Sequence, residues 1–346
     1  MNKLLFISTN NGSDMRINKE IKTLSKHTDI YFLGVGKYGN SNYAEKNCKE
    51  FILIQEKRNS INAILKQIKT FLKLNRKHKF TSIHIINEQL MIFFYPWLFQ
   101  QYVVLDIFDS FFMKKNKPKN QWKLIKKMVY APINYIFVTD KNRESLMPDF
   151  VQNKLGILEN YPNRYHGDVV KKVDKLTIFY NGSMNNSRGT ILLQNLTDKY
   201  KDVKVIMAGW LSDENTKNFA QSKSVDFKGV LTQLEASKIA ANQAHYIMCC
   251  YEPSNQNNIN ASPNKIYDAI QTHTPVIINS EVKVSSFVKE ENLGVILSSF
   301  SNYNVDEVYQ ELLFKKDSFS FNKKNAEKYS WESIENKLLK AHKLIQ

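Results

Sequence analysis

The chain has 346 residues, of which 42% are hydrophobic and 12% aromatic, enough to build two domains with sizeable cores. Its 49 Lys and Arg exceed its 33 Asp and Glu by 16, which favours an anionic partner such as a nucleic acid, a membrane surface or a phosphorylated ligand. Short apolar runs argue against a signal peptide or transmembrane helix, and three cysteines without metal-site spacing suggest a reducing cytoplasm.

The first half of the chain alternates short apolar runs with helical patterns. Buried strands are expected at residues 4–7, 30–33, 83–86, 103–105 and 135–138. A helix is expected at about residues 16–26, after the polar loop that follows the first strand. Such alternation predicts a mostly parallel sheet covered by helices on both sides.

A domain boundary is expected at residues 160–163, followed by a polar, charged stretch to Lys175. The alternation then restarts, with strands expected at residues 176–180, 203–207, 225–227, 246–250 and 276–278. A final helix is expected at residues 330–346. Two doubly wound domains follow, and their ligands should gather at the carboxyl ends of the strands, in the cleft between the domains.

The segment at residues 262–279 is the most informative part of the chain. Ser262 is a good N-cap and Pro263 suits the first helical position. Lys265 adds a positive charge to a helix start whose free N–H groups favour an anion, and Asp268 shares its face. The segment therefore indicates a diphosphate site with a carboxylate for ribose hydroxyls. An ordinary helix–strand unit of an α/β domain is the alternative.

Glycine-containing loops follow the first strand of each half. Gly12 permits a tight turn in the loop at residues 8–17, where Asp14 and Arg16 are candidates to line a ligand cleft, although no G-x-G-x-x-G is present. In the loop at residues 178–190, Asn181-Gly182 should end the strand and Arg188 should reach a diphosphate. A surface Arg is the alternative, but a cation at a helix start is unfavourable unless an anion is also there.

The order of these motifs resembles the family-4 glycosyltransferases over nearly the whole chain. The matching motifs are Tyr180-Asn181-Gly182, Arg188-Gly189, Ala208-Gly209, Phe227-Lys228-Gly229, Pro263-Asn264-Lys265-Ile266-Tyr267-Asp268 and His273-Thr274-Pro275-Val276-Ile277. Residues 103–112 and 135–163 fit the first domain of such enzymes, and Tyr329-Ser330-Trp331-Glu332 resembles the start of their closing helix. Each motif is weak alone, and their order and spacing make the match fairly specific.

The resemblance implies the GT-B fold. This is an α/β architecture of two doubly wound Rossmann-like domains facing across a cleft, with a C-terminal helix that crosses back to the first domain. Residues 1–163 with 330–346 would bind the acceptor, and residues 164–329 would bind the nucleotide sugar. The implied reaction moves a sugar from a nucleotide diphosphate sugar to an acceptor hydroxyl with retention of configuration.

The resemblance also implies roles for individual residues. Arg188 and Lys265 would neutralise the leaving diphosphate, and Asp109 is the first-domain candidate for a catalytic role. The residues expected to bind the donor are Asn11, Gly12, Gly182, Gly209, Asn260, Ser262 and Asp268. The donor would be UDP- or GDP-linked, and with two cations at the leaving group no metal or other cofactor is expected.

Three positions depart from the family's pattern. Asn260 replaces the first carboxylate of a Glu-x7-Glu pair, whose second member falls on Asp268. His273 stands where a helix-ending Gly is usual, and it fits if that position is not strongly left-handed or if His accepts that backbone conformation. Phe108 replaces a first-domain His beside Asp109. The first and third departures leave open a non-catalytic, nucleotide-binding partner subunit of a glycosyltransferase complex, and a nucleotide-sugar epimerase is a further alternative.

The basic segments in the first half of the chain suggest what the acceptor is. Residues 113–127 are dense in Lys, and residues 56–79 combine basic side chains with apolar residues at helical spacing. Such surfaces suit an anionic membrane face, so we expect a glycan or lipid-linked sugar acceptor, peripheral contact with the inner face of the plasma membrane, and a role in bacterial surface polysaccharide or glycolipid assembly. A solvated lysine face over an ordinary core helix is the alternative. No nucleic-acid-binding module is recognisable.

Overall fold

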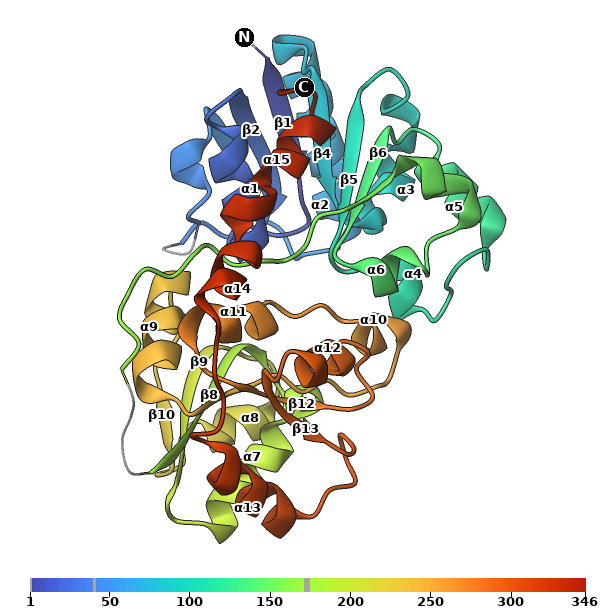
Figure 1. Cartoon of the computed structure of the whole chain (residues 1–346). Coiled ribbons are helices and arrows are strands. Elements are labelled where there is room, and N and C mark those ends of the chain that lie inside the picture. Colours follow the sequence, from blue (N-terminus) through green and yellow to red (C-terminus); the bar gives the residue numbers. More distant parts are fainter. Residues whose placement is uncertain (1, 40–41, 171–174) are drawn as a thin grey trace. The chain divides into compact units, whose positions relative to one another are not determined.

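The computed structural model describes residues 2–39, 42–170 and 175–346, and the chain divides into two compact units (Figure 1). Unit 1 comprises Met1–Asn160 with Ile334–Gln346, and unit 2 comprises Tyr161–Ser333. Each unit is built on its own parallel sheet. Residues 171–174, in the charged stretch expected after the boundary, lie outside the described residues.

Unit 1 contains a seven-stranded sheet in the order β3-β2-β1-β4-β5-β6-β7, with every neighbouring pair parallel. The strands are β1 (Lys3–Ile7), β2 (Asp29–Val35), β3 (Glu50–Ile54), β4 (Ser82–Ile86), β5 (Val103–Ile107), β6 (Tyr135–Val138) and β7 (Leu155–Ile157). The five predicted strands are confirmed. The two edge strands, β3 and β7, were not predicted. Strand β7 is short and partly exposed, whereas β3 reads EFILI and carries an apolar run comparable to those of the predicted strands.

The helices of unit 1 cover both faces of this sheet (Figure 1). They are α1 (Met15–Leu24), α2 (Ile61–His78), α3 (Met91–Phe94), α4 (Phe111–Lys114), α5 (Lys123–Tyr130), α6 (Lys141–Glu144) and the greater part of α15 (Trp331–Ala341). Because parallel crossovers are right-handed, α1 and α2, whose crossovers run in opposite directions along the sheet, cover opposite faces. Among the described residues, no helix combines the length and apolar character needed to cross a membrane.

The last helix packs within unit 1, as expected for a chain that crosses back. The Thr23 hydroxyl donates to the Glu335 carboxylate at 2.8 Å, which ties α15 to α1. The Tyr102 hydroxyl donates to the carbonyl of Ala341 at 3.0 Å. The apolar side of this amphipathic helix, including Leu338 and Leu339, is buried.

Unit 2 contains a six-stranded parallel sheet in the order β10-β9-β8-β11-β12-β13. Its strands are β8 (Leu176–Met184), β9 (Val203–Leu211), β10 (Val225–Phe227), β11 (Tyr246–Met248), β12 (Val276–Asn279) and β13 (Gly294–Leu297). Its helices are α7 (Thr190–Lys199), α8 (Glu214–Phe219), α9 (Gln233–Gln243), α10 (Gln256–Ile259), α11 (Asn264–Thr272), α12 (Ser285–Glu290), α13 (Val305–Lys315) and α14 (Lys323–Lys328). The strand order reverses between β8 and β11, so the loops after these strands diverge and leave room for a ligand.

Candidate functional site

Arg188 lies in the loop after β8, at the point where the strand order of unit 2 reverses. Gly189 adopts the left-handed conformation, with φ at 103°, and a Cβ there would clash with the Met248 side chain. This turn places Arg188 immediately before α7. The guanidinium carbon of Arg188 lies 3.8 Å from the ring centroid of Tyr251, which follows β11. One guanidinium nitrogen of Arg188 is buried without a hydrogen-bond partner, and no carboxylate pairs with Arg188 in the described part of the chain.

A second cation lies beside Arg188 at the start of α11. Lys265 is the second residue of this helix, and no side chain caps its N-terminus. Burial lowers the pKa of Lys265 to about 8, and the positive charge of Arg188 contributes to that lowering. The thiol of nearby Cys249 remains protonated at neutral pH, because burial raises its pKa to about 12. Asp268 is the acidic neighbour, so two cations and a helix N-terminus converge with one carboxylate beside them. The arrangement is suited to bind a multiply charged anion.

The loop before α11 differs in detail from the expectation. The residue that caps α11 is Pro263, so the prediction that Ser262 is the N-cap and Pro263 the first helical residue is wrong by one position. The Ser262 hydroxyl does not cap the helix; it is buried and makes no hydrogen bond within the described residues. The Asn260 amide donates to the backbone carbonyl of Gln256 at 2.9 Å and to the side-chain oxygen of the same residue at 3.1 Å. The Asn260 amide is therefore held by α10, at the position where the family-4 pattern would place a carboxylate.

The C-terminal end of α11 explains how His273 replaces the usual glycine. His273 adopts the left-handed conformation at φ 51° and ψ 40°, and its N–H donates to the carbonyl of Ala269. Its ring stacks on Phe321 at 5.5 Å between centroids. The conformation required by the helix end is therefore kept, and the stacked ring contributes packing that a glycine would lack.

Gly182 and Gly209 lie side by side in β8 and β9. The prediction that β8 ends at Gly182 is wrong, because the strand continues to Met184 and pairs Gly182 with Gly209. A Cβ on Gly209 would overlap the carbonyl oxygen of Gly182, so close strand contact explains that glycine without a ligand. A Cβ on Gly182 would meet no atom within 4 Å, so open space lies beside this glycine.

Asn11, Gly12 and Asp109 belong to unit 1 and do not share a unit with Arg188. Gly12 has φ at 76° in the turn after β1, and the Asn11 amide donates to the carbonyl of Lys37 at 3.1 Å. Asp109 follows β5, and its carboxylate accepts from Lys114 at 2.6 Å. The structure thus places Lys265, with Asp268 near it, beside Arg188 in unit 2, and separately positions these three residues at the strand ends of unit 1.

Arg16 does not line an open site, contrary to expectation. Its side chain is buried, and its guanidinium donates to both oxygens of Asp106 at 2.7 and 2.8 Å. A further nitrogen donates to the carbonyl of Leu158 at 2.9 Å, and Glu20 lies 3.0 Å away on the same helix. Asp14 is the N-cap of α1 and accepts from the backbone N–H of Arg16. Both residues therefore serve the local structure of unit 1.

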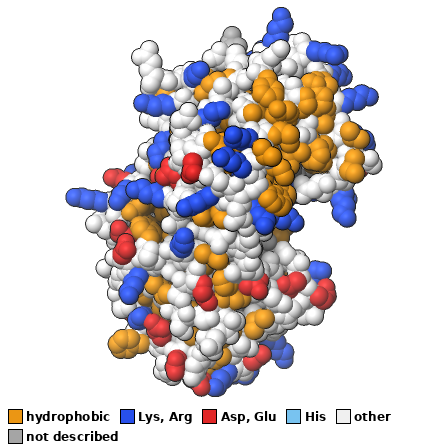
Figure 2. All heavy atoms as spheres, turned by 90° about the vertical axis from the view of Figure 1, so that its right-hand side faces the viewer, with side chains coloured by type: hydrophobic (Ala, Val, Ile, Leu, Met, Phe, Trp, Pro, Cys, Tyr) orange, Lys and Arg blue, Asp and Glu red, His pale blue; other side chains and the backbone are white. Residues whose placement is uncertain are grey.

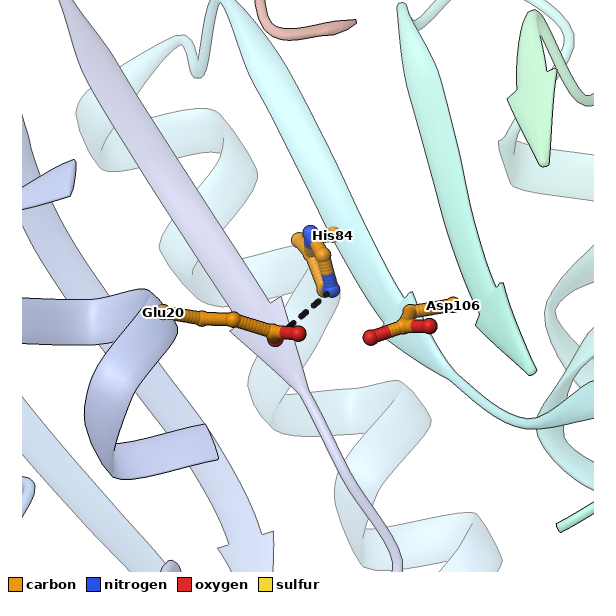
Figure 3. Close-up of side chains that lie close together, drawn as sticks. All are labelled: Glu20, His84 and Asp106. Carbon is orange, nitrogen blue, oxygen red and sulfur yellow. Dashed lines mark ion pairs between the residues drawn. The ribbon is translucent and has the colours of Figure 1, made fainter. Parts of the chain in front are cut away.

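Two histidines extend this buried cluster. Glu20, His84 and Asp106 lie close together on α1, β4 and β5 (Figure 3), and Nε2 of His84 is 3.4 Å from Glu20. Nδ1 of His84 is 3.0 Å from Nε2 of His342, whose other nitrogen is 2.7 Å from the Ser82 hydroxyl. Sequence motifs do not single out His84 or His342. The one indication in the sequence that polar groups meet here is that a His and an Asp interrupt the otherwise apolar strands β4 and β5.

The cluster of Glu20, His84 and Asp106 has ligand atoms within 4.8 Å of one another, close enough to hold a metal ion. Two observations oppose that use. The Arg16 guanidinium already neutralises Asp106, and burial with the charge of Asp106 raises the pKa of Glu20 well above its usual value. Burial likewise lowers the pKa of His84. A neutral Glu20 and a neutral His84 balance the charge without a metal, whereas a divalent ion beside Arg16 would leave a buried excess of positive charge.

Of the comparisons with known proteins, only the comparison of structures finds matches. No protein-family model matches the chain, and no curated protein matches it in sequence. In structure, it is similar to sucrose-phosphate synthase from Thermosynechococcus elongatus (TM-score 0.74, 11% identity, covering 99% of this chain and 98% of that one). It is also similar to Anabaena HepE in complex with UDP and glucose (0.71, 9%, all of both chains) and to a putative UDP-N-acetylglucosamine 2-epimerase from Listeria monocytogenes (0.60, 8%, 99% and 95%). The chain therefore has the GT-B fold, two Rossmann-like α/β domains with parallel sheets.

Proposed function

We propose that the chain is a glycosyltransferase that moves a sugar from a UDP- or GDP-linked donor to an acceptor hydroxyl with retention. The observation that carries this proposal is the pair of cations at the start of α7 and α11. The Arg188 guanidinium lies over the ring of Tyr251, and no carboxylate forms an ion pair with it in the described part of the chain. Lys265 is partly buried beside Arg188, although placing two like charges together in a buried region is unfavourable. Such a pair is stabilised when a diphosphate is bound. The structural neighbour HepE, whose complex contains UDP and glucose, supports the same assignment.

The proposed mechanism follows from where charge develops. Negative charge grows on the diphosphate as the bond to the sugar breaks, and Arg188 and Lys265 would stabilise that charge more in the transition state than in the ground state. Asp268 would accept hydrogen bonds from the ribose hydroxyls, and the buried Ser262 hydroxyl would donate to the donor. The open space beside Gly182 would allow a close approach of the donor to β8.

Asn11, Gly12 and Asp109, at the strand ends of unit 1, remain proposals for residues that bind the donor or the acceptor. Gly209 is proposed only as the packing partner that keeps β8 and β9 close. The acceptor is proposed to be a glycan or a lipid-linked sugar, reached from the cytoplasm at the inner face of the plasma membrane. Assembly of a bacterial surface polysaccharide or glycolipid is the corresponding biological role.

The test is a calorimetric binding panel of UDP, GDP and ADP on the wild type and on Arg188→Met. One nucleotide should bind, and the variant should bind it about 10- to 100-fold more weakly, because a charge-assisted hydrogen bond is lost. Arg164→Met is the matched control, since Arg164 is also in unit 2 but pairs with Glu327 at 2.8 Å on the surface. Equal binding by both variants and the wild type would remove the basis of the proposal.

Two other functions have specific support. The Listeria epimerase shares the fold, so incubation with UDP-N-acetylglucosamine alone, without an acceptor, should yield a sugar inverted at C2 if this chain is an epimerase. A non-catalytic subunit is favoured by Asn260, whose amide is held by Gln256 where the family has a carboxylate. Nucleotide binding without sugar transfer to any acceptor, restored to transfer by a partner protein, would favour that role.

A further inference from the structure

Exposed apolar side chains gather on one face of unit 1, over α3, α5 and the short 3-10 helix Tyr95–Trp97 between them (Figure 2). The principal members are Phe93, Trp97, Phe99, Trp122, Leu124 and Ile125, which we call the α3–α5 face. Helix α3 packs against α5, so these side chains form one surface. Leu124 is 83% exposed and Phe99 is 55% exposed, so they project from the surface instead of lining a pocket. A cluster of this size on a water-facing surface requires an explanation.

The local sequence explains why this face is uncovered. Residues 91–99 read MIFFYPWLF and are apolar on every side of a short helix. Met91, Phe94 and Leu98 supply the side that is buried in the core of unit 1. The opposite side, including Phe93 and Trp97, has no layer of protein above it within the described residues. A helix that is apolar all round is stable only where both sides leave water.

Lysines lie around the apolar surface, and few acids compensate them: Lys114 pairs with Asp109, which lies just before the lysine-rich segment. Residues 110–139 contain seven Lys and no Asp or Glu. Lys123 and Lys127 of α5 are exposed and make no ion pair in the described part of the chain. Lys126 is buried, and its ammonium donates to the carbonyls of Lys117 and Lys119, which fixes the preceding loop against α5. The positive charge is therefore held in place beside the projecting apolar side chains.

We propose that the α3–α5 face docks on an anionic lipid bilayer. Trp97 and Trp122 suit the boundary between headgroups and acyl chains, where amphipathic rings are favoured, and Leu124 would insert below them. The lysines would contact anionic headgroups. A bilayer needs no complementary shape, which fits a projecting surface. A second copy docked through the same face would bring two lysine-rich surfaces together, so charge disfavours that occupant.

The basic helix α2 offers a smaller apolar contact. Ile61 and Leu65 are exposed at its N-terminal end, but Phe71 of its apolar stripe is buried in the core, and Ile68 and Leu72 pack against that core. The α3–α5 face would be the membrane contact of the proposed glycosyltransferase. Only the biological role of docking rests on that proposed function. Docking itself requires no sugar transfer.

The test is flotation of the full chain with vesicles of phosphatidylcholine alone or mixed with phosphatidylglycerol. Wild type should float with the mixed vesicles, and binding should weaken as salt screens the lysines. Leu124→Glu should reduce binding at least about tenfold, because a carboxylate would have to enter the interface of an anionic bilayer. Phe314→Glu is the matched control, since Phe314 is 85% exposed on α13 of unit 2 and should change nothing.

Lysine variants measure the electrostatic part separately. Each of Lys123→Gln and Lys127→Gln should weaken binding about fivefold. Absence of binding by the wild type, or equal loss in Phe314→Glu and Leu124→Glu, would overturn the proposal. A concentration-dependent dimer without vesicles that Leu124→Glu abolishes would assign the face to a second copy instead. Nucleotide affinity of Leu124→Glu should equal that of the wild type, so failure of the donor site and failure of docking give different results.

Discussion

The charge of Lys265 should make the proposed nucleotide binding depend on pH, in a direction set by the burial of that side chain. Burial and the nearby Arg188 lower the pKa of Lys265 to about 8 in the free protein. A bound diphosphate favours the charged form, so the neutral form is the one that binds poorly. The apparent dissociation constant of a nucleoside diphosphate should therefore rise as the pH passes about 8.

The size of this effect follows from the fraction of protein that carries the charge. With a pKa of about 8, Lys265 is about 90% charged at pH 7 and about 10% charged at pH 9. If only the charged form binds, the apparent dissociation constant is the intrinsic one divided by that fraction. The affinity should then fall about eight- to tenfold between about pH 7 and pH 9.

Isothermal titration of the nucleotide that binds, at about pH 7, 8 and 9, measures this dependence. Lys265→Met should bind at least about tenfold more weakly at pH 7 and show a flatter profile, because no side chain remains to titrate there. Lys265→Arg stays charged between pH 7 and 9, so its nucleotide affinity should also lack the pH dependence that Lys265 causes. Ionisation of the nucleotide is common to all three proteins. A wild-type slope no steeper than that of Lys265→Met would refute the reasoning.

Three further predictions concern stability and are measured by urea denaturation. Gly209→Ala should destabilise unit 2 by about 3 kcal/mol or more, since its Cβ overlaps the Gly182 carbonyl, whereas Gly182→Ala should cost about 1–3 kcal/mol, from backbone strain alone. Similar losses from both substitutions would argue against that contact. Asp106→Asn should cost about 3–5 kcal/mol, because Arg16 loses its buried counter-charge. Because the pKa of Glu20 is raised in the folded state, its stabilising contribution is full below the unfolded value of 4.5 and is lost as the pH rises toward the folded value. Glu20→Gln should therefore be more stable than wild type near pH 8, with the gain fading toward pH 4.5; a gain that grows in acid would contradict a protonated Glu20.

The sequence by itself determined the architecture of the two sheets. A strand such as β5 is apolar on both faces, so it must lie inside a sheet covered on both sides, and its alternation with helices requires parallel neighbours. Local rules also placed Lys265 in the first turn of α11 and a glycine before α7. These features depend on residues a few positions apart, which a linear pattern records directly.

Helix ends and edge strands were the parts that local rules placed less well. Helix α11 begins one residue later than predicted. Strand β8 continues beyond Gly182 because its partner β9 supplies backbone hydrogen bonds, which the sequence of β8 does not indicate. Strand β7 lies at the sheet edge, has three residues and is only partly buried, so its pattern carried little signal, whereas the missed edge strand β3 has a clear apolar run. Pairing with a neighbour, instead of local preference, set these boundaries.

Only the tertiary structure decided what the buried charges do. Arg16 lies in a loop that resembles a ligand-binding turn, yet its partner Asp106 is 90 residues away in the chain, and His84 meets His342 across 258 residues. The same holds for the α3–α5 face, where the sequence showed an apolar run but not which side the core would leave uncovered. Both outcomes depend on which distant segments the sheet order brings into contact, and the free energy of a charge or an apolar side chain is set by those neighbours.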